Sequence, residues 1–419
     1  PVRPDWHEPS DLLGYISRIS GVRYVATDFL KFMILAWCHA AESADEDNIV
    51  LKNVDEIPPF WLCLDEMNLA PVEQYFADYL SVLETREWRG ETKAYHCEAL
   101  LKVGVFDELE GCTVLGEAEN AFEVFWKSVC PPTEQNKELR DNLKQYFRKN
   151  GIPLPPNLIV AGTVNMDETT HGFSRKVIDR ALTLDFQEFF PNNYDEFFSV
   201  ENNGGMKMFS FPRITQFRPE DLKNSIDLKQ TEIAQESVVE NDSALPEPNG
   251  DEASGVKPES DQNESEASSA SVESRSVEFL KGLNGILKDT PFELGFRALN
   301  ELLLSVVCMR PSDNQALLAV WDDFLMQKVL PRIEGDTQKL KSLHGTKVEG
   351  HDEGTYGSGS ILHDLYSFLR SDEALREIWD KGRPDLLRGG QGDINCRTRK
   401  KLEWMMRRLR TRRSTDFWV

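Results

Sequence analysis

Two adjacent carboxylates stand directly after an apolar run in the first part of the chain. Residues 59–64 (PFWLCL) are typical of a parallel strand buried on both faces, and Asp65 and Glu66 follow them. At the carboxyl end of such a strand, one carboxylate can hold Mg²⁺ while its neighbour polarises a water molecule for attack on a phosphoryl group. A strand that simply meets solvent is the alternative, and the dipeptide alone does not decide between them.

A second apolar run, residues 157–165, ends in Asn165, and Asp167 follows two residues later. In an open parallel sheet, ligands bind beyond the carboxyl ends of the strands, so we expect Asn165 and Asp65 to share one crevice. There the Asn165 amide can orient an attacking water or a phosphate oxygen. The alternative is a turn, where Asn and Asp are common because their side chains hydrogen-bond to nearby backbone groups.

Arg175 and Arg180 follow this second run, in a short helix predicted at residues 173–180. Arginine neutralises the charge that develops on a transferring phosphoryl group, in cis or from a neighbouring subunit. A helical arginine is more commonly a plain surface residue. The position of both side chains after Asn165 favours a role in the site.

The elements that must position these residues are those of an α/β unit. From residue 1 to about 190, short apolar runs alternate with helical patterns, which is typical of a parallel sheet with crossover helices. The patterns predict helices at residues 28–41 and 71–84, a further strand at 181–186, and an insertion at about 86–150 that contains a hairpin and a helix near 134–149.

An acidic tract separates this unit from a helical one. The chain of 419 residues has a formal net charge of −23, and residues 219–275 are rich in Asp, Glu, Ser and Asn. Because that tract has few large apolar side chains, we expect residues 191–276 to be a connector with a disordered acidic insertion. Residues 277–419 are predicted to form a helical lid.

The lid ends in a basic helix, predicted at residues 398–410. Basic residues crowd positions 397–401 and 407–413. This pattern is typical of the solvated face of a terminal helix, and a patch for nucleic acid or an acidic partner is the alternative.

Composition excludes some classes of protein. No apolar run reaches the roughly 20 residues that span a bilayer, so no integral membrane protein is expected. Seven cysteines lie scattered without a Cys-x-x-Cys pair, which indicates reduced thiols in a cytoplasm rather than a disulfide framework or a zinc site.

Taken together, the ordered motifs resemble those of AAA+ NTPases of the McrB type, the motor subunits of modification-dependent restriction systems. Residues 64–70 (LDEMNLA) and 72–76 (VEQYF) resemble the Walker B region. Residues 162–171 (GTVNMDETTH) are similar to the sensor-1 strand and loop, and residues 174–181 (SRKVIDRA) resemble the segment that carries the arginine finger. Residues 295–297 (GFR) resemble the opening of a sensor-2 helix.

The resemblance implies an α/β fold: an AAA+ parallel-sheet base, incomplete at its N-terminus, spans residues 1–190 and is followed by the helical lid domain. It implies that Asp65 coordinates Mg²⁺ and that Glu66 activates the hydrolytic water. Asn165 is the implied sensor 1.

Five further residues receive roles from the same resemblance. Arg180 is the implied arginine finger that reaches into the next subunit, with Arg175 as the second choice. Arg297 is the implied sensor-2 contact, and Asn68 and Asp167 match positions close to the nucleotide.

One departure from the family is the phosphate loop. No Gly-x-x-x-x-Gly-Lys-Ser/Thr motif occurs in the 419 residues. In the family this loop precedes the stretch that residues 2–15 resemble, so we expect it upstream of Pro1. A degenerate subunit that does not hydrolyse nucleotide is the alternative.

The function implied is ATP or GTP hydrolysis by a hexameric ring in a restriction or defence system. A McrC-like nuclease subunit is the implied partner, and DNA is read through an upstream domain. The offset between Asn165 and Asp167 departs from the Asn-Thr-Ala-Asp pattern of McrB, which favours ATP. The alternatives are a MoxR or dynein-related ATPase that remodels proteins, and a non-enzymatic scaffold whose acidic tract recruits basic partners.

Overall fold

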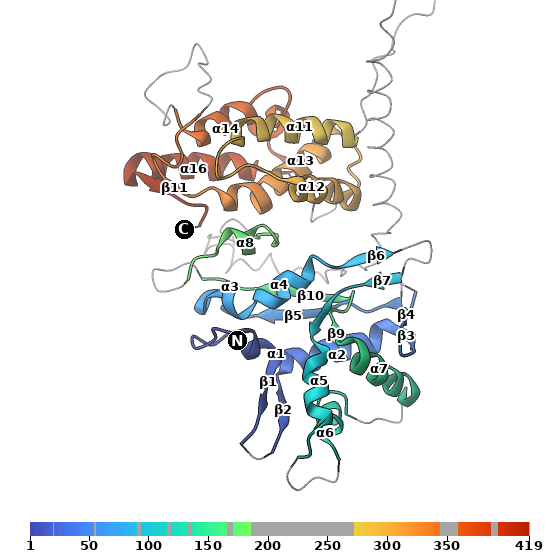
Figure 1. Ribbon diagram of the computed structural model, residues 1–419. Coiled ribbons are helices and arrows are strands. Elements are labelled where there is room, and N and C mark those ends of the chain that lie inside the picture. Colours follow the sequence, from blue (N-terminus) through green and yellow to red (C-terminus); the bar gives the residue numbers. More distant parts are fainter. Residues whose placement is uncertain are drawn as a thin grey trace, which may run out of the picture. The chain divides into compact units, whose positions relative to one another are not determined.

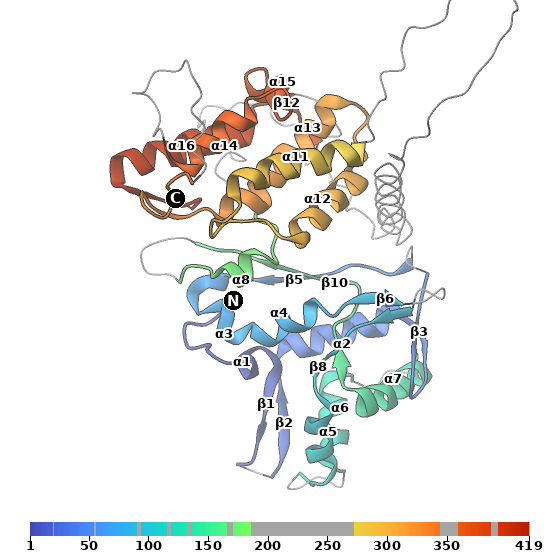
Figure 2. The same ribbon diagram turned by 45° about the horizontal axis from the view of Figure 1, so that its top comes forward.

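The computed structural model describes residues 1–19, 21–53, 56–89, 94–114, 119–131, 136–165, 171–185, 272–343, 359–386 and 393–418. The described residues fall into two compact units. The first unit holds those up to Asp185 together with Trp418, and the helical unit holds those from Val272 to Phe417 (Figure 1, Figure 2). Among the described residues, no helix combines the length and the apolar composition needed to cross a bilayer.

The first unit consists of short helices and two-stranded sheets. Its helices are α1 (Pro9–Leu13), α2 (Asp28–Ala40), α3 (Val72–Tyr75), α4 (Ala77–Leu83), α5 (Val103–Glu110), α6 (Ala121–Val129), α7 (Lys137–Asn150) and α8 (Arg175–Ile178). Four of its sheets are antiparallel: β1 (Gly14–Ser17) with β2 (Arg23–Ala26), β3 (Ala41–Ala44) with β4 (Ile49–Leu51), β6 (Glu87–Arg89) with β7 (Ala94–His96), and β8 (Ala99–Leu101) with β9 (Ile152–Pro153). The fifth pair is parallel and joins β5 (Phe60–Leu64) to β10 (Leu158–Gly162).

Helix α2 lies in the core of the first unit. Thr27 caps its start, because the Thr27 hydroxyl accepts a hydrogen bond from the Leu30 amide at 3.3 Å. The buried Trp37 ring packs against Phe147 of α7, and its indole N–H donates to the Pro153 carbonyl at 2.7 Å. The helix thereby ties the insertion to the segment that leads into β10.

Most predicted elements of the first unit are confirmed, and two are corrected. The helix predicted at 71–84 is divided at Phe76, whose backbone (φ −103°, ψ 5°) leaves the helical region and separates α3 from α4. The strand predicted at 181–186 is wrong for residues 181–185, which carry no strand. Leu182 and Leu184 are 61% and 60% exposed, so the alternating apolar side chains there have no sheet to pack in.

Strand β5 is also less enclosed than the sequence predicts. Leu64 is buried, but Trp61 is 52% exposed and Cys63 is exposed, so one face of the strand is uncovered. Among the described residues β5 pairs with β10 alone, and every described sheet has two strands. A larger parallel AAA+ base therefore stays a prediction.

The helical unit contains α11 (Val272–Leu287), α12 (Phe296–Met309), α13 (Asn314–Phe324), α14 (Ile361–Leu369), α15 (Arg376–Trp379) and α16 (Arg397–Arg412). Helix α11 packs against α12 and α14, and α16 packs against α13 and α14 (Figure 2). Two short pairs complete it: β11 (Gly335–Asp336) with β14 (Ser414–Thr415), and β12 (Arg383–Pro384) with β13 (Asp393–Ile394). The basic helix predicted at residues 398–410 is confirmed as α16, and α11 begins at Val272, ahead of residue 277, where the helical segment is predicted to start.

A buried carboxylate on α13 connects this helix to α16 and to the β12–β13 pair. Asp322 Oδ2 accepts hydrogen bonds from Arg383 Nε at 2.6 Å and from the Arg397 amide at 3.0 Å. Its Oδ1 accepts from the Thr398 amide at 2.9 Å and from the Cys396 thiol at 3.3 Å. Both Asp322 and Arg383 are almost fully buried. One side chain thus pairs a buried cation and satisfies two amides at the start of α16.

We predict that Asp322→Ala lowers the free energy of unfolding of the helical unit by about 3–5 kcal/mol, because it breaks the buried ion pair with Arg383, leaving Asp323 as the carboxylate partner of that guanidinium, and leaves the Arg397 and Thr398 amides without their acceptor. Denaturant unfolding of the full chain, with hydrogen exchange of α13 and α16 amides as the local reporter, measures the change.

Asp372→Ala is the matched control for this variant. Asp372 pairs with Arg376 on the surface, where the two side chains are 77% and 64% exposed. Its loss is expected to change stability by no more than about 0.5 kcal/mol. Similar effects of the two substitutions would contradict the role given to Asp322.

Candidate functional site

Strands β5 and β10 end at the same level (Figure 1). Gly162 lies opposite Leu64 in the parallel register, so Asp65 and Thr163 leave the sheet side by side. The contact continues beyond the strands, since the Thr163 amide donates to the Leu64 carbonyl at 3.0 Å and the Met67 amide donates to the Thr163 carbonyl at 2.8 Å. A β-carbon at position 162 would lie 2.4 Å from the Met67 sulfur, so any larger residue there would force the Met67 side chain to shift.

The Thr163 hydroxyl links the two candidate catalytic carboxylate residues. It donates to Asp65 Oδ1 at 2.7 Å and accepts from the Glu66 amide at 2.9 Å. One hydroxyl therefore fixes the Asp65 side chain and the Glu66 backbone at once. Sequence reasoning did not single out Thr163, although its place next to the end of an apolar run beside Asn165 is a signal that could have found it.

The Glu66 backbone adopts a left-handed conformation, with φ 53° and ψ 49°. Such a conformation costs an L-residue with a side chain about 1–2 kcal/mol. Two hydrogen bonds hold this conformation in place. The Glu66 amide donates to the Thr163 hydroxyl, and the Leu69 amide donates to the Glu66 carbonyl at 2.9 Å. Glu66 and Asp65 are both exposed. Backbone strain of this kind gathers at functional sites, so it adds weight to Glu66 as a candidate.

Asn68 is buried and joins the first loop to the second. Its Nδ2 donates to the Asn165 carbonyl at 2.8 Å and to the His171 carbonyl at 3.3 Å, while its Oδ1 accepts from the Asn165 amide at 3.3 Å. These bonds make Asn68 a positioning residue for the Asn165 backbone. The buried Tyr75 hydroxyl supports the same loop by donating to the Met67 carbonyl at 2.9 Å, and burial raises the pKa of that hydroxyl, so it stays protonated.

Both candidate arginines lie on or beside α8. Arg175 is its first residue, and Arg180 follows its end. Arg180 Nε donates to Glu84 Oε1 at 2.7 Å in a partly buried ion pair, and Glu84 stands directly after α4. Val177 and Ile178 are buried and anchor the short helix to the first unit. Arg180 is thus held within its own chain at the end of α4.

The remaining predicted site residues are Arg297 and Asp167. Arg297 is the second residue of α12 in the helical unit, where it is exposed, and its sensor-2 role stays a prediction. Asp167 lies outside the described residues. No cluster of three or more His, Cys, Asp or Glu side chains suited to a metal occurs in the described part of the chain. Mg²⁺ in nucleotide sites needs only one or two carboxylates besides phosphate and water, so Asp65 fits that ion.

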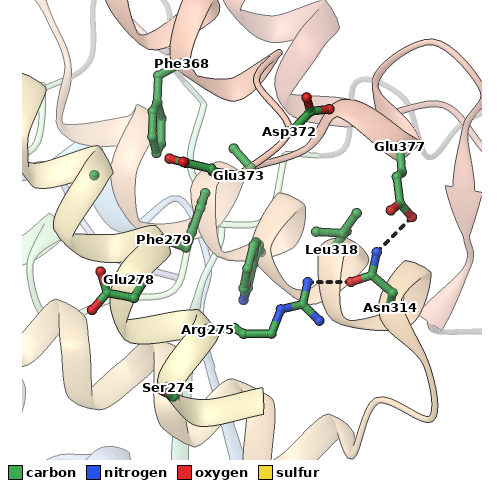
Figure 3. Close-up of a pocket in the computed structure, with 13 residues that line it drawn as sticks. Ser274, Arg275, Glu278, Phe279, Asn314, Leu318, Phe368, Asp372, Glu373 and Glu377 are labelled. Atoms are coloured by element: carbon green, nitrogen blue, oxygen red, sulfur yellow. Dashed lines mark hydrogen bonds between the residues drawn. The ribbon is translucent and has the colours of Figure 1, made fainter. Parts of the chain in front are cut away.

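A cavity of about 490 Å³ in the helical unit is lined by none of these residues (Figure 3). Arg275 of α11 donates to Asn314 Oδ1 at 2.5 Å, and Asn314 Nδ2 donates to Glu377 Oε2 at 2.8 Å. Phe279 and Trp321 stack with ring centroids 4.3 Å apart, and the Arg275 guanidinium lies 5.9 Å from the centre of the Trp321 ring. Arg275, Asn314 and Glu377 therefore bind one another along this wall.

Comparison with known protein families finds a similarity over the range of the helical unit. The family described as "Domain of unknown function (DUF8727)" matches residues 255–414, a range that holds α11 to α16. None of the curated proteins and none of the solved structures matches the chain. The match thus assigns no activity.

We predict that Asn68→Ala opens the loop around Asn165 while the sheet persists, because it leaves buried backbone groups without partners at a cost of about 1–3 kcal/mol. Hydrogen exchange of the Asn165 and Met67 amides should accelerate about tenfold for each 1.4 kcal/mol lost.

Asn157→Ala provides the matched control. Asn157 is also fully buried and donates to the Pro58 and Ala36 carbonyls, but at the opposite end of the strand pair. It should accelerate exchange around Phe60 and leave Asn165 less affected. Equal acceleration at Asn165 in both variants would show that Asn68 has no local role.

Proposed function

We propose that the first unit is the nucleoside-triphosphatase part of an AAA+ ring motor. The observation that carries this proposal is the parallel β5–β10 pair, which brings Asp65, Glu66 and Asn165 to one edge. Two strand ends that present carboxylates and an amide at one edge suit the hydrolysis of a nucleotide phosphate. The Walker B and sensor-1 resemblance of the same residues supports the assignment.

In this proposal each side chain has a separate task. Asp65 holds Mg²⁺, which neutralises charge on the phosphates when it binds with the nucleotide. The Thr163 hydroxyl fixes one Asp65 oxygen, so the carboxylate is oriented before the ion arrives. Glu66 accepts the proton of the attacking water. Asn165, whose backbone Asn68 holds, orients that water or a phosphate oxygen.

The 419 residues contain no phosphate-loop motif, so this proposal needs another source for the groups that bind the nucleotide phosphates. In such sites, backbone amides and one lysine make most of the contacts with the phosphates. We propose that sequence preceding Pro1 supplies it, and that ATP is the substrate rather than GTP. The hexameric ring, the McrC-like nuclease partner, DNA as the target and a cytoplasmic location belong to the same proposal. All seven cysteines are free thiols, which agrees with that compartment.

We expect Glu66→Gln to reduce nucleotide turnover by about 10²–10⁴-fold, because the amide cannot accept the proton of the attacking water. Nucleotide binding should persist, since Asp65 remains. The measurement is steady-state hydrolysis and equilibrium nucleotide binding by the encoded protein, with whatever sequence precedes Pro1. Glu138→Gln, at an exposed residue of α7 outside the proposed motifs, is the control and should keep full turnover. Unchanged turnover of Glu66→Gln would remove Glu66 from the mechanism.

Arg180→Ala is expected to lower turnover by about 10³-fold if its guanidinium stabilises the transferring phosphoryl group of a neighbouring subunit. Mixed assemblies of Arg180→Ala and Glu66→Gln subunits should regain part of the activity, because some interfaces then combine an intact Glu66 with an intact Arg180. Arg175→Ala is the matched comparison and should retain more activity. A lack of recovery in mixed assemblies would contradict action in trans.

A further inference from the structure

Two buried cysteines from distant parts of the first unit lie in direct contact. Cys38 belongs to α2 and Cys130 directly follows α6, and their Sγ atoms are 3.9 Å apart in a thiol hydrogen bond. The two residues are 92 positions apart in the sequence, so the fold brings them together. They are only 8% and 6% exposed. A single buried cysteine commonly acts as a small apolar residue, whereas two thiols in contact can also react with each other.

The geometry of this pair is close to that of a disulfide. A disulfide has an S–S distance of about 2.05 Å, so the two sulfurs need to approach by about 1.9 Å. Cys130 has φ −134° and ψ 76°, which is outside the helical region, and its amide still donates to the Trp126 carbonyl at 2.8 Å. A residue at the end of a helix adjusts its conformation more readily than one inside a helix. Cys130 can therefore move towards Cys38 while α2 keeps its place.

A cation lies close to the pair. Arg140 of α7 donates from Nη1 to the carbonyl of Pro131, the residue after Cys130, at 2.5 Å. The hydrogen bond from the Cys38 thiol and the Arg140 charge lower the pKa of Cys130 to about 7, against the opposing effects of burial and of Asp141. The same hydrogen bond, together with burial, raises the pKa of Cys38. Because the thiolate is the nucleophile, Cys130 is the sulfur that reacts first.

We propose that Cys38 and Cys130 form a reversible disulfide when the folded protein meets hydrogen peroxide. The Cys130 thiolate attacks one peroxide oxygen and the O–O bond breaks, which gives a sulfenic acid on Cys130 and a hydroxide ion. The Cys38 sulfur then attacks the Cys130 sulfur, the S–O bond breaks, and the hydroxyl group leaves with the Cys38 proton as water. In total the two thiols lose two electrons and two protons, and the peroxide is reduced to two molecules of water.

This disulfide fixes the end of α6 to the central helix of the first unit. Helix α2 already contacts α6 and α7, and its Trp37 indole holds the Pro153 carbonyl ahead of β10. A bond between residues 92 positions apart also removes conformational entropy from the unfolded chain. The oxidised first unit should therefore be more stable than the reduced one. The inference does not rest on nucleotide hydrolysis.

The test is mass spectrometry of the full chain after reduction, removal of the reductant and treatment with hydrogen peroxide. The chain should lose about 2 Da, the mass of two hydrogen atoms, and alkylation in denaturant should label two fewer of its seven cysteines. A digest without reductant should contain a peptide that joins Cys38 to Cys130, and dithiothreitol should restore all the thiols. The melting temperature of the linked form should be higher by about 5–15 °C.

Two variants separate the roles of the two sulfurs. Cys38→Ala should form no linked peptide and should leave a sulfenic acid on Cys130, which dimedone traps. Cys130→Ala should give neither the linked peptide nor a trapped sulfenic acid at Cys38. Cys97→Ala is the matched control, because Cys97 is also buried in the first unit, and it should form the linked peptide as the unchanged protein does. Serine replaces alanine at either position if the alanine variant does not fold.

Several results would overturn the proposal. One is that all seven thiols remain after peroxide treatment of the folded protein, and another is that the link appears only in urea. A link from Cys130 to a different cysteine would contradict the pairing. A linked form that melts below the reduced protein would show that the bond forms only at the expense of the fold.

Discussion

The parallel ladder between β5 and β10 is the contact on which the placement of the acidic loop depends. Its strands lie 98 residues apart in the sequence, from Phe60 to Leu158. Because they run in the same direction, Asp65 and Asn165 leave the sheet at one edge. An antiparallel pairing of the same five-residue strands would put the two residues at opposite ends, about 16 Å apart. A slip of one residue would turn every side chain to the other face.

Three further residues convert this shared edge into a fixed loop structure. Gly162 permits close approach of Met67, Thr163 bonds to both Asp65 and Glu66, and Asn68 bonds to the backbone at Asn165. These contacts offset the unfavourable left-handed backbone of Glu66. Hydrogen bonds thus fix the backbone of the loop, while the side chains of Asp65 and Glu66 remain exposed to solvent. That combination suits the binding of a charged ligand.

The sequence predicted the elements that depend on local pattern and missed the contacts that depend on register. The apolar runs located β5 and β10, the helical pattern located α16, and the carboxyl ends of the runs located Asp65 and Asn165. The hydrogen bond between Thr163 and Asp65 and the ion pair between Arg180 and Glu84 each join residues almost a hundred positions apart. No local sequence pattern predicts such contacts. The strand predicted at 181–186 followed local propensity, but strand propensity needs a neighbouring strand to be realised.

The charge on α16 explains why its start needs the buried carboxylate of α13. A helix N-terminus carries partial positive charge, and Arg397, Arg399 and Lys400 in the first turn add to it, which opposes helix formation. Asp322 accepts hydrogen bonds from two amides of that turn, and Asp323 pairs with Arg397 at 3.2 Å. Burial of Asp322 against Arg383 alone would be a weak source of stability, since desolvation offsets most of the attraction. Its value lies in fixing a helix whose exposed side is rich in repelling cations.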